Sequence, residues 1–117
     1  MPTAQLTFHT PSPCPQCGCA SHADAIDHEA VKTTGGLLAA LGDPIRLGIV
    51  ELLSRHDRLC VCEIVEAFPV EQQTISHHLR LLREAGLVDV VRRGHWAYYG
   101  LRREAMKRLA QELVRLL

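Results

Sequence analysis

The spacing of apolar residues along the chain changes from helical to alternating and back to helical. Over residues 23–41 apolar residues recur every three or four positions, which predicts an amphipathic helix that the Gly35-Gly36 pair weakens or splits. The run Gly42-Asp43-Pro44 restarts the pattern, with Asp43 as the expected N-cap and Pro44 at the first helical position. A second helix is therefore expected from Pro44 to about Arg55.

Two shorter helices separated by a turn are predicted next. The first runs from about Val61 to Phe68, where Pro69 ends it, and the second covers Glu71 to Ala85, with Gly86 as its cap. The polar residues of the second helix lie near its start, while its apolar residues keep helical spacing. This order predicts a helix-turn-helix unit, whose second helix would read DNA in the major groove.

After Gly86 the apolar residues alternate, which is the pattern of half-buried strands. Residues 87–91 and 96–101 predict two strands joined by a tight basic turn, Arg92-Arg93-Gly94-His95. An amphipathic helix is expected from about Arg103 to Leu117. The complete pattern predicts a mainly α fold with a small β-hairpin, that is, a winged helix-turn-helix.

Composition divides the chain into two parts. Residues 1–22 hold four of the six prolines and three of the five cysteines, and we expect a flexible, Cys-containing N-terminal arm there. Residues 23–117 are expected to form one domain for DNA binding and dimerisation. The chain has no apolar run of about 18 residues and no signal-peptide pattern, so we expect a cytoplasmic protein without membrane contact.

The charges favour nucleic acid as a partner, although the formal net charge is zero. From Arg80 to Arg108 there are eight basic and three acidic residues, whereas no Lys or Arg precedes Lys32. Such a basic C-terminal half is suited to phosphate binding.

The candidate DNA-binding residues lie at the start of the second helix of the helix-turn-helix and in the hairpin turn. Gln side chains pair with adenine, Ser, Thr and His donate to bases or phosphates, and Arg contacts phosphates. The candidates are Gln72, Gln73, Thr74, Ser76, His77, Arg80, Arg92, Arg93 and His95. The alternative interpretation is a solvated helix face with arginines that aid solubility.

Four segments of the chain carry a family resemblance: Ala40–Leu47, Leu59–Ile64, Thr74–Val88 and Arg93–Tyr99. Over about residues 25–110 they resemble, in sequence and order, the ArsR/SmtB family of metal-responsive winged-helix repressors. The resemblance implies a homodimer, held by the N-terminal helix region and the C-terminal helix, that binds double-stranded operator DNA. It also implies a transcriptional repressor that an inducer ion releases from genes for metal efflux or detoxification.

The five cysteines form two groups, Cys14, Cys17 and Cys19 in the arm, and Cys60 and Cys62 at the start of a predicted helix. Closely spaced thiols in a reducing compartment are more often metal ligands or redox groups than structural disulfides. Residues two apart in a regular helix point in divergent directions, so the second pair can share an ion only where the helix starts or is distorted. A helix start also lowers thiol pKa values and favours the thiolate.

The resemblance implies that the Cys-Val-Cys pair binds a soft ion with further cysteines from elsewhere. Arsenite sensors of the family often place a third Cys one turn later, but Val65 occupies that position here. Cadmium and lead sensors of the family, and some arsenite sensors, add cysteines from an N-terminal arm, often that of the partner subunit. The resemblance therefore implies the ligands Cys60, Cys62, Cys14, Cys17 and Cys19. Arsenite, As(III), fits a site of Cys60, Cys62 and one arm thiol, whereas cadmium or lead fits four thiols. Arsenite is the favoured inducer, because the second zinc site of the family is not expected and the helix-turn-helix and wing resemble those of arsenic sensors most. Cd(II), Pb(II) and Zn(II) are the alternatives.

Other interpretations of the cysteines stay open. In a redox-sensing repressor, an oxidant would join an arm cysteine to Cys60 or Cys62. Cys62 is otherwise a small core residue, and Cys14 and Cys17 are candidates for a separate zinc site. An enzyme is not expected, and neither is an organic cofactor. The sequence lacks a Ser/His/Asp arrangement, a phosphate-binding Gly loop and paired catalytic carboxylates.

The last helix is expected to contribute to dimerisation. The second metal site of the family uses His and acidic ligands on the C-terminal helices, but residues 103–117 contain no His, so this site is not expected. An apolar stripe of Met106, Leu109, Leu113 and Leu116 would instead form part of the dimer interface. His77 and His78 are interpreted as DNA-binding or packing residues rather than metal ligands.

Overall fold

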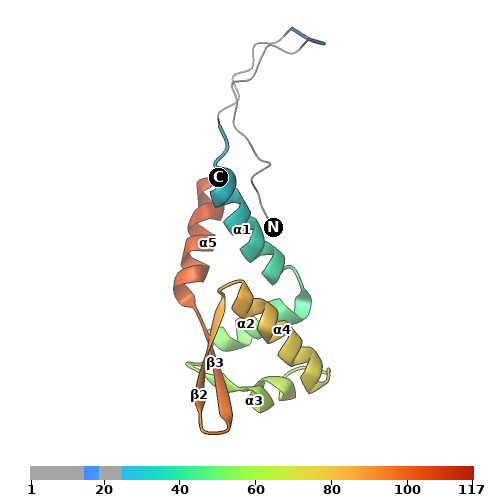
Figure 1. Cartoon of the computed structure of the whole chain (residues 1–117), viewed down its shortest axis with the longest axis vertical. Coiled ribbons are helices and arrows are strands. Elements are labelled where there is room, and N and C mark those ends of the chain that lie inside the picture. Colours follow the sequence, from blue (N-terminus) through green and yellow to red (C-terminus); the bar gives the residue numbers. More distant parts are fainter. Residues whose placement is uncertain (1–14, 19–24) are drawn as a thin grey trace. The chain divides into compact units, whose positions relative to one another are not determined.

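The computed structural model describes residues 15–18 and 25–117. The chain divides into two compact units, Met1–Thr33 and Thr34–Leu117. Within the first unit the structure describes a turn at residues 15–17 and the start of helix α1 (His28–Leu41) (Figure 1). The rest of the expected arm lies outside the described residues.

Helix α1 begins at His28 because Asp27 caps it. The Asp27 Oδ1 atom accepts a hydrogen bond from the Ala30 N–H at 3.1 Å, and the Asp27 carbonyl accepts one from the Val31 N–H at 3.0 Å. Residues 25–27 are not helical, so the predicted start at about residue 23 is too early. The helix continues unbroken through Gly35-Gly36 and is not split there.

Helix α2 (Pro44–Ser54) starts where the sequence predicts. The side chain of Asp43 accepts hydrogen bonds from the backbone N–H groups of Ile45 at 2.9 Å and Arg46 at 3.1 Å. These bonds, chiefly the one from Arg46, stabilise the carboxylate and hold the pKa of Asp43 below its usual value. The cap thereby fixes the first turn of α2 directly after α1.

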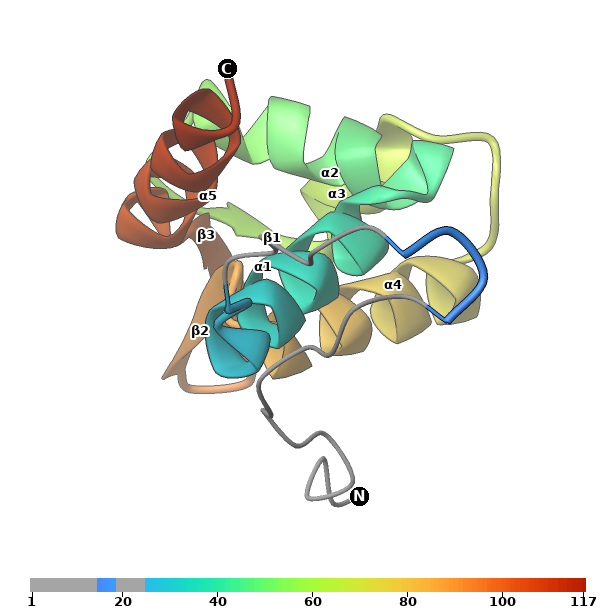
Figure 2. The same ribbon diagram turned by 90° about the horizontal axis from the view of Figure 1, so that it is seen from above.

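The helix-turn-helix consists of α3 (Val61–Glu66) and α4 (Gln72–Glu84), which a loop connects (Figures 1 and 2). Helix α3 ends two residues before the predicted Phe68. Helix α4 ends at Glu84, and Gly86 follows the C-cap Ala85. The positive φ of Gly86, 81°, lets the N–H groups of Gly86 and Leu87 bond back to the carbonyls of Arg83 and Leu82. This end turns the chain sharply into the following strand.

A short strand that the sequence pattern did not predict completes a three-stranded sheet. The antiparallel strands have the order β1 (Leu59–Cys60), β3 (Trp96–Leu101), β2 (Val88–Arg93). Strand β1 has only two residues, and it pairs Cys60 with Tyr98 of β3. A segment this short carries no visible alternation, and its strand character comes from that tertiary pairing.

Strands β2 and β3 form the predicted hairpin, the wing (residues 88–101), seen as a finger in Figure 1. Its turn is shorter than predicted, because Arg92 and Arg93 belong to β2 and only Gly94 and His95 form the turn. Gly94 has a φ of 62° at the first turn position, a positive value that two-residue hairpins of the II′ type need there. The arginines therefore project from a strand rather than a loop.

One apolar core holds the helix-turn-helix against α2 and the base of the wing. Its fully buried side chains are Ile49, Leu53, Ile64, Ile75, Leu79, Leu82 and Leu87. Within the described part of the chain, no helix is long and apolar enough to cross a membrane.

Helix α5 (Arg103–Arg115) has apolar residues of two kinds. Leu109 is 4% exposed and belongs to the core, and Met106 packs against the core. Leu113 and Leu116 are 40% and 71% exposed. The predicted single interface stripe is therefore wrong for Leu109, because the first part of α5 covers the domain core and only the last turns remain as an apolar surface.

Candidate nucleic-acid interface and thiol pair

Helix α4 has one core face and one polar face. Ile75, Leu79 and Leu82 are fully buried on the first. The predicted DNA-binding residues of the helix are exposed, apart from the half-buried Thr74; they are Gln72, Gln73, Thr74, Ser76, His77 and Arg80. Because the polar residues cluster at the start of the second helix of a helix-turn-helix, they lie where such a helix meets base edges.

The tip of the wing carries the other predicted residues, since Arg92, Arg93 and His95 are all exposed. The neighbouring Trp96, opposite Arg93 in the hairpin, is 58% exposed and was not singled out from the sequence. The feature of the sequence that could have indicated Trp96 is its position directly after the turn, where the pattern predicts no apolar residue for it to pack against. Guanidinium groups beside an exposed indole can contact phosphates and the edge of a groove.

Arg58 has a structural role at the base of the wing that the sequence did not reveal. Its Nη1 atom lies 2.8 Å from Asp89 Oδ1 on β2 and 3.3 Å from the carbonyl oxygen of Tyr98 on β3, to which it donates. Gly100 leaves room for this arginine, because a Cβ there would lie 3.1 Å from Arg58 Nη1. Arg58 therefore ties the two wing strands to the segment that leads into β1.

The thiols of Cys60 and Cys62 lie together at the start of α3. Cys60 is the N-cap in extended conformation, with φ −80° and ψ 163°, and Cys62 lies in the first helical turn. The two Sγ atoms are 2.6 Å apart in a hydrogen bond. The break from strand to helix between the two residues explains why thiols two positions apart point to the same side. Cys60 is buried and Cys62 is exposed.

A third side chain organises this helix start. The Glu63 Oε1 atom accepts a hydrogen bond from the Cys60 backbone N–H at 2.9 Å, and this bond lowers the pKa of Glu63. The neighbouring Cys62 thiol, followed by burial, raises the pKa of the Cys60 thiol. The expected lowering of the thiol pKa is therefore wrong for Cys60.

The arm cysteines are only partly covered by the structure. Cys17 is exposed and lies in the first unit, whereas Cys14 and Cys19 lie outside the described residues. Among the described residues, no group of three or more His, Cys, Asp or Glu side chains is placed to hold a metal ion. The described part of the chain thus brings together two thiols of the five predicted ligands.

The chain resembles known proteins over the segment that carries these features. Residues 43–90 match the family described as "Bacterial regulatory protein, arsR family". An uncharacterized HTH-type transcriptional regulator of Methanocaldococcus jannaschii is 39% identical over 71 residues, which are 61% of this chain and 80% of that protein. The chain belongs to the ArsR family.

Two further ArsR-family relatives have names that mention a toxic element. The arsenical resistance operon repressor of Escherichia coli is 48% identical over 65 residues, 56% of each protein. A cadmium resistance transcriptional regulatory protein homolog of Staphylococcus aureus is 37% identical over 73 residues, 62% of this chain and 60% of that protein. The chain spans less than two-thirds of the length of either relative.

A solved structure confirms the predicted fold class of this ArsR-family chain. The homodimeric winged helix-turn-helix DNA-binding domain of a possible ArsR-family regulator from Mycobacterium bovis superimposes with a TM-score of 0.64 at 27% identity. The superposition covers 80% of this chain and 89% of that one. The family match at residues 43–90 includes the thiol pair and α4, whereas Arg92, Arg93 and His95 lie beyond it.

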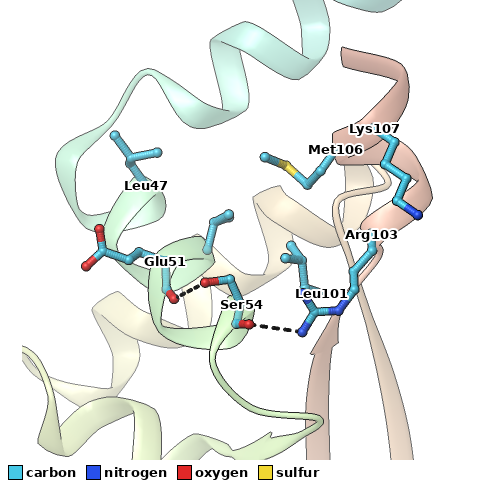
Figure 3. Close-up of a pocket in the computed structure, with 8 residues that line it drawn as sticks. Leu47, Glu51, Ser54, Leu101, Arg103, Met106 and Lys107 are labelled. Carbon is cyan, nitrogen blue, oxygen red and sulfur yellow. Dashed lines mark hydrogen bonds between the residues drawn. The ribbon is translucent and has the colours of Figure 1, made fainter. Parts of the chain in front are cut away.

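This chain also has an apolar groove of about 420 Å³ where α2, the end of β3 and the start of α5 meet (Figure 3). Arg103 Nη2 donates to the Ser54 carbonyl oxygen at 3.1 Å, which joins α5 to the end of α2 at the rim. Neither Cys nor His lines the groove. Its lining residues are Leu47, Val50, Glu51, Ser54, Leu101, Arg103, Met106 and Lys107.

Proposed function

We propose that this ArsR-family protein is a repressor that binds operator DNA as a homodimer and is released when a thiophilic ion, in first place As(III), binds Cys60 and Cys62. The observation that carries the proposal is the contact of the two Sγ atoms, 2.6 Å apart, at the start of the first helix of the DNA-binding unit. Two thiols on one side of a helix start are a ready-made chelate for a soft ion.

DNA binding is supported by the distribution of exposed polar and cationic side chains. Helix α4 presents Gln72, Gln73, Ser76 and His77 for base edges, and the wing tip presents Arg92-Arg93 for phosphates. Each phosphate contact by an arginine releases counterions. We therefore expect binding to weaken steeply with salt.

Dimerisation is supported by the apolar residues that one subunit leaves exposed. On α1 Leu38 is 41% exposed, and at the end of α5 Leu113, Val114 and Leu116 are 40%, 64% and 71% exposed. Exposed apolar side chains grouped on helix ends are typical of subunit interfaces. A twofold dimer would also place two copies of α4 on successive half-sites of the operator.

The ion site needs a third ligand, and the arm is its source in this proposal. As(III) requires three thiols, so Cys60, Cys62 and one of Cys14, Cys17 and Cys19 would complete it. Cd(II), Pb(II) or Zn(II) would take four ligands and recruit a second arm residue. Arsenite is preferred because the arm then has to supply only one thiol.

The position of Cys60 suggests how an ion would reach the DNA-binding surface. Cys60 pairs with Tyr98 in the sheet of the wing and is also the N-cap of α3. A ligand that moves this residue therefore acts on the wing and on the helix-turn-helix at once. A difference of a few kcal/mol in ion affinity between the DNA-binding conformation and another is enough to release the operator.

The test is a titration of the reduced protein with arsenite, Cd(II), Pb(II) and Zn(II). Thiolate absorption in the ultraviolet and release of a duplex selected from a random library by the wild-type protein are recorded in the same samples. We expect release at one arsenite per subunit with three thiols consumed. Release of the duplex by Cd(II) or Pb(II) but not by arsenite, with four thiols consumed, would instead indicate a cadmium- or lead-responsive repressor.

Variants locate the ligands. The exposed Cys62 is the first target, and Cys62→Ser is expected to keep duplex binding and lose arsenite release. Single Cys→Ser changes at positions 14, 17 and 19 identify the arm ligand as the one whose loss matches the effect of Cys62→Ser. Retained release by the Cys60→Ser, Cys62→Ser double variant would exclude the thiol pair as the sensor.

A redox switch is the second candidate, and the exposure of the Cys62 thiol favours it, because an oxidant can reach this thiol. Peroxide would oxidise two thiols to one disulfide and be reduced to water, with Cys60 or Cys62 joined to an arm cysteine. Release by peroxide, reversed by dithiothreitol and unaffected by every ion tested, would support this function over ion sensing.

A further inference from the structure

A cluster of Asp43, Arg46 and His78 connects three helices away from the thiol pair. His78 lies on α4 next to the exposed His77, but its own side chain is only 12% exposed. Its Nδ1 atom is 3.2 Å from Arg46 Nη1, and its Nε2 atom is 3.9 Å from Asp43 Oδ2. Both ring nitrogens therefore face residues at the start of α2.

The donor inventory fixes the tautomer of this imidazole. A guanidinium group has only donors, so the His78 Nδ1 atom must accept from Arg46 and the ring proton must be on Nε2. That N–H then points toward the carboxylate of Asp43. The Nε2 atom lies 3.9 Å from Asp43 Oδ2, which is beyond hydrogen-bond distance, so the hydrogen bond that holds the ring is the one to Arg46.

Arg46 extends the link to the end of α1. Its Nε atom donates to the Ala40 carbonyl oxygen at 2.6 Å, and its Nη2 atom donates to the Ala39 carbonyl oxygen at 3.5 Å. These carbonyls belong to the last turn of α1, where a helix leaves C=O groups without partners from the regular helical pattern. The Ala39 carbonyl also accepts a hydrogen bond from the Gly42 N–H at 3.2 Å. One guanidinium group thus joins the end of α1 to the flank of α4.

The neighbouring contacts of α4 are of a different kind. Ile75, Leu79 and Leu82 hold the helix through buried apolar area, which is non-directional and permits small rotations or shifts. The bond between Arg46 and His78 is directional, because its strength falls steeply when the angle or the distance changes. It is thus the contact that can set the rotation of α4 about its own axis.

We propose that Arg46 and His78 are positioning residues for operator binding, which orient the polar face of α4 relative to the α1–α2 turn. This inference rests on the proposed DNA binding through α4 and is independent of the ion. In a dimer joined through α1, the same link would set the distance and angle between the two copies of α4, and hence the half-site spacing that the protein accepts.

The test uses the full chain and a duplex that the wild-type protein selects from a random library. His78→Leu removes both polar contacts, whereas His78→Gln keeps an acceptor for Arg46 and a donor for Asp43. Affinity is measured at several salt concentrations, and the unfolding midpoint is measured in parallel. We expect His78→Leu to bind the duplex about tenfold more weakly, because hydrogen bonds to charged groups are the strong ones. The slope of log affinity against log salt concentration, the salt slope, should stay unchanged.

Rescue and control variants distinguish a role of His78 in orienting α4 from direct contact with DNA and from an effect on folding stability. His78→Gln is expected to restore most of the affinity, and Arg46→Lys, which loses the guanidinium fork, to weaken binding as His78→Leu does. His77→Leu changes the same residue type at the adjacent exposed position, and we expect it to alter base preference or salt slope. The His78→Leu variant should also tolerate an inserted base pair between half-sites better than the wild type.

Two results would overturn the inference. One is wild-type affinity in folded His78→Leu or Arg46→Lys protein. The other is a salt slope reduced by about one in His78→Leu, which would mean that His78 contacts a phosphate itself. Failure of the wild-type protein to select any duplex would overturn the proposed function together with this inference.

Discussion

The two helices of the DNA-binding unit differ in how firmly they are held. Helix α3 has six residues and one fully buried side chain, Ile64, whereas α4 has thirteen residues and three, Ile75, Leu79 and Leu82. The start of α3 carries the thiol pair, while the flank of α4 is bonded to α2 through His78.

This difference places the proposed sensing chemistry on the weakly held helix and the proposed DNA reading on the firmly held one. Short elements with few buried contacts open locally at lower free energy than elements anchored in a core. An ion at Cys60 and Cys62 would therefore act where displacement costs least. In this proposal α4 would keep its internal geometry and change mainly in its orientation.

Truncation of one apolar side chain on each helix should show the largest effect. Leu79→Ala on α4 is expected to lower the free energy of unfolding by about 2–5 kcal/mol, because Leu79 has no solvent exposure. Val65→Ala on α3 is expected to cost about 1 kcal/mol, because Val65 is only half-buried. Urea unfolding of both variants measures the difference, and equal losses would contradict the comparison.

A smaller effect is expected at the contact between α2 and the turn that joins the two helices. A Cβ at Gly48 would lie 2.8 Å from Phe68 Cε1, so Gly48→Ala must displace that ring. We expect a loss of about 1–3 kcal/mol in the free energy of unfolding, although alanine favours helices. The matched control is Gly36→Ala in α1, where nothing lies within 4 Å of the added Cβ.

If the Phe68 ring leaves no room for a Cβ at position 48, the changes in unfolding temperature of Gly48→Ala and Gly36→Ala have opposite signs. Gly36→Ala is expected to raise the unfolding temperature, because alanine in a helix adds up to about 1 kcal/mol to the free energy of unfolding. A stabilised Gly48→Ala protein would show that the Phe68 ring moves freely, and hence that the turn is looser than the packing indicates.

The smallest effect concerns pH at the cap that supports Arg46. The pKa of Asp43 is lowered in the folded state, so its stabilising contribution is present above the unfolded value of about 3.9 and is lost as pH falls through the lower folded value. Asp43→Asn keeps a capping acceptor without the titration. We expect its unfolding temperature to fall less than that of the wild type between about pH 5 and pH 2, whereas parallel curves would contradict the role of the cap.

The sequence predicted the order of elements well, because period and cap signals are local. Asp43-Pro44 marked the start of α2, and Gly86 marked the end of α4, as the structure has them. Strand β1 was missed, since two residues show no period and pair only through β3. Leu109 was assigned to an interface because the periodicity of a helix face does not tell what covers it.

The sequence predicted which residue types form the site, but it did not predict their contacts and burial. The spacing of Cys60 and Cys62 indicated a helix start, but the mutual contact and burial that raise the pKa of Cys60 depend on the fold. His78 could not be separated from His77 by sequence, since the two are adjacent and identical. Only the packing of α4 on α2 turns one toward Arg46 and leaves the other exposed.

The hairpin also gives the subunit an optical reporter. Trp96 is the single tryptophan of the chain and is 58% exposed on the wing. It lies two residues before Tyr98, the strand partner of Cys60, so both aromatic side chains point to the same face of β3. All indole fluorescence of the protein therefore comes from the tip of the wing, and its emission can follow duplex and ion binding without any label.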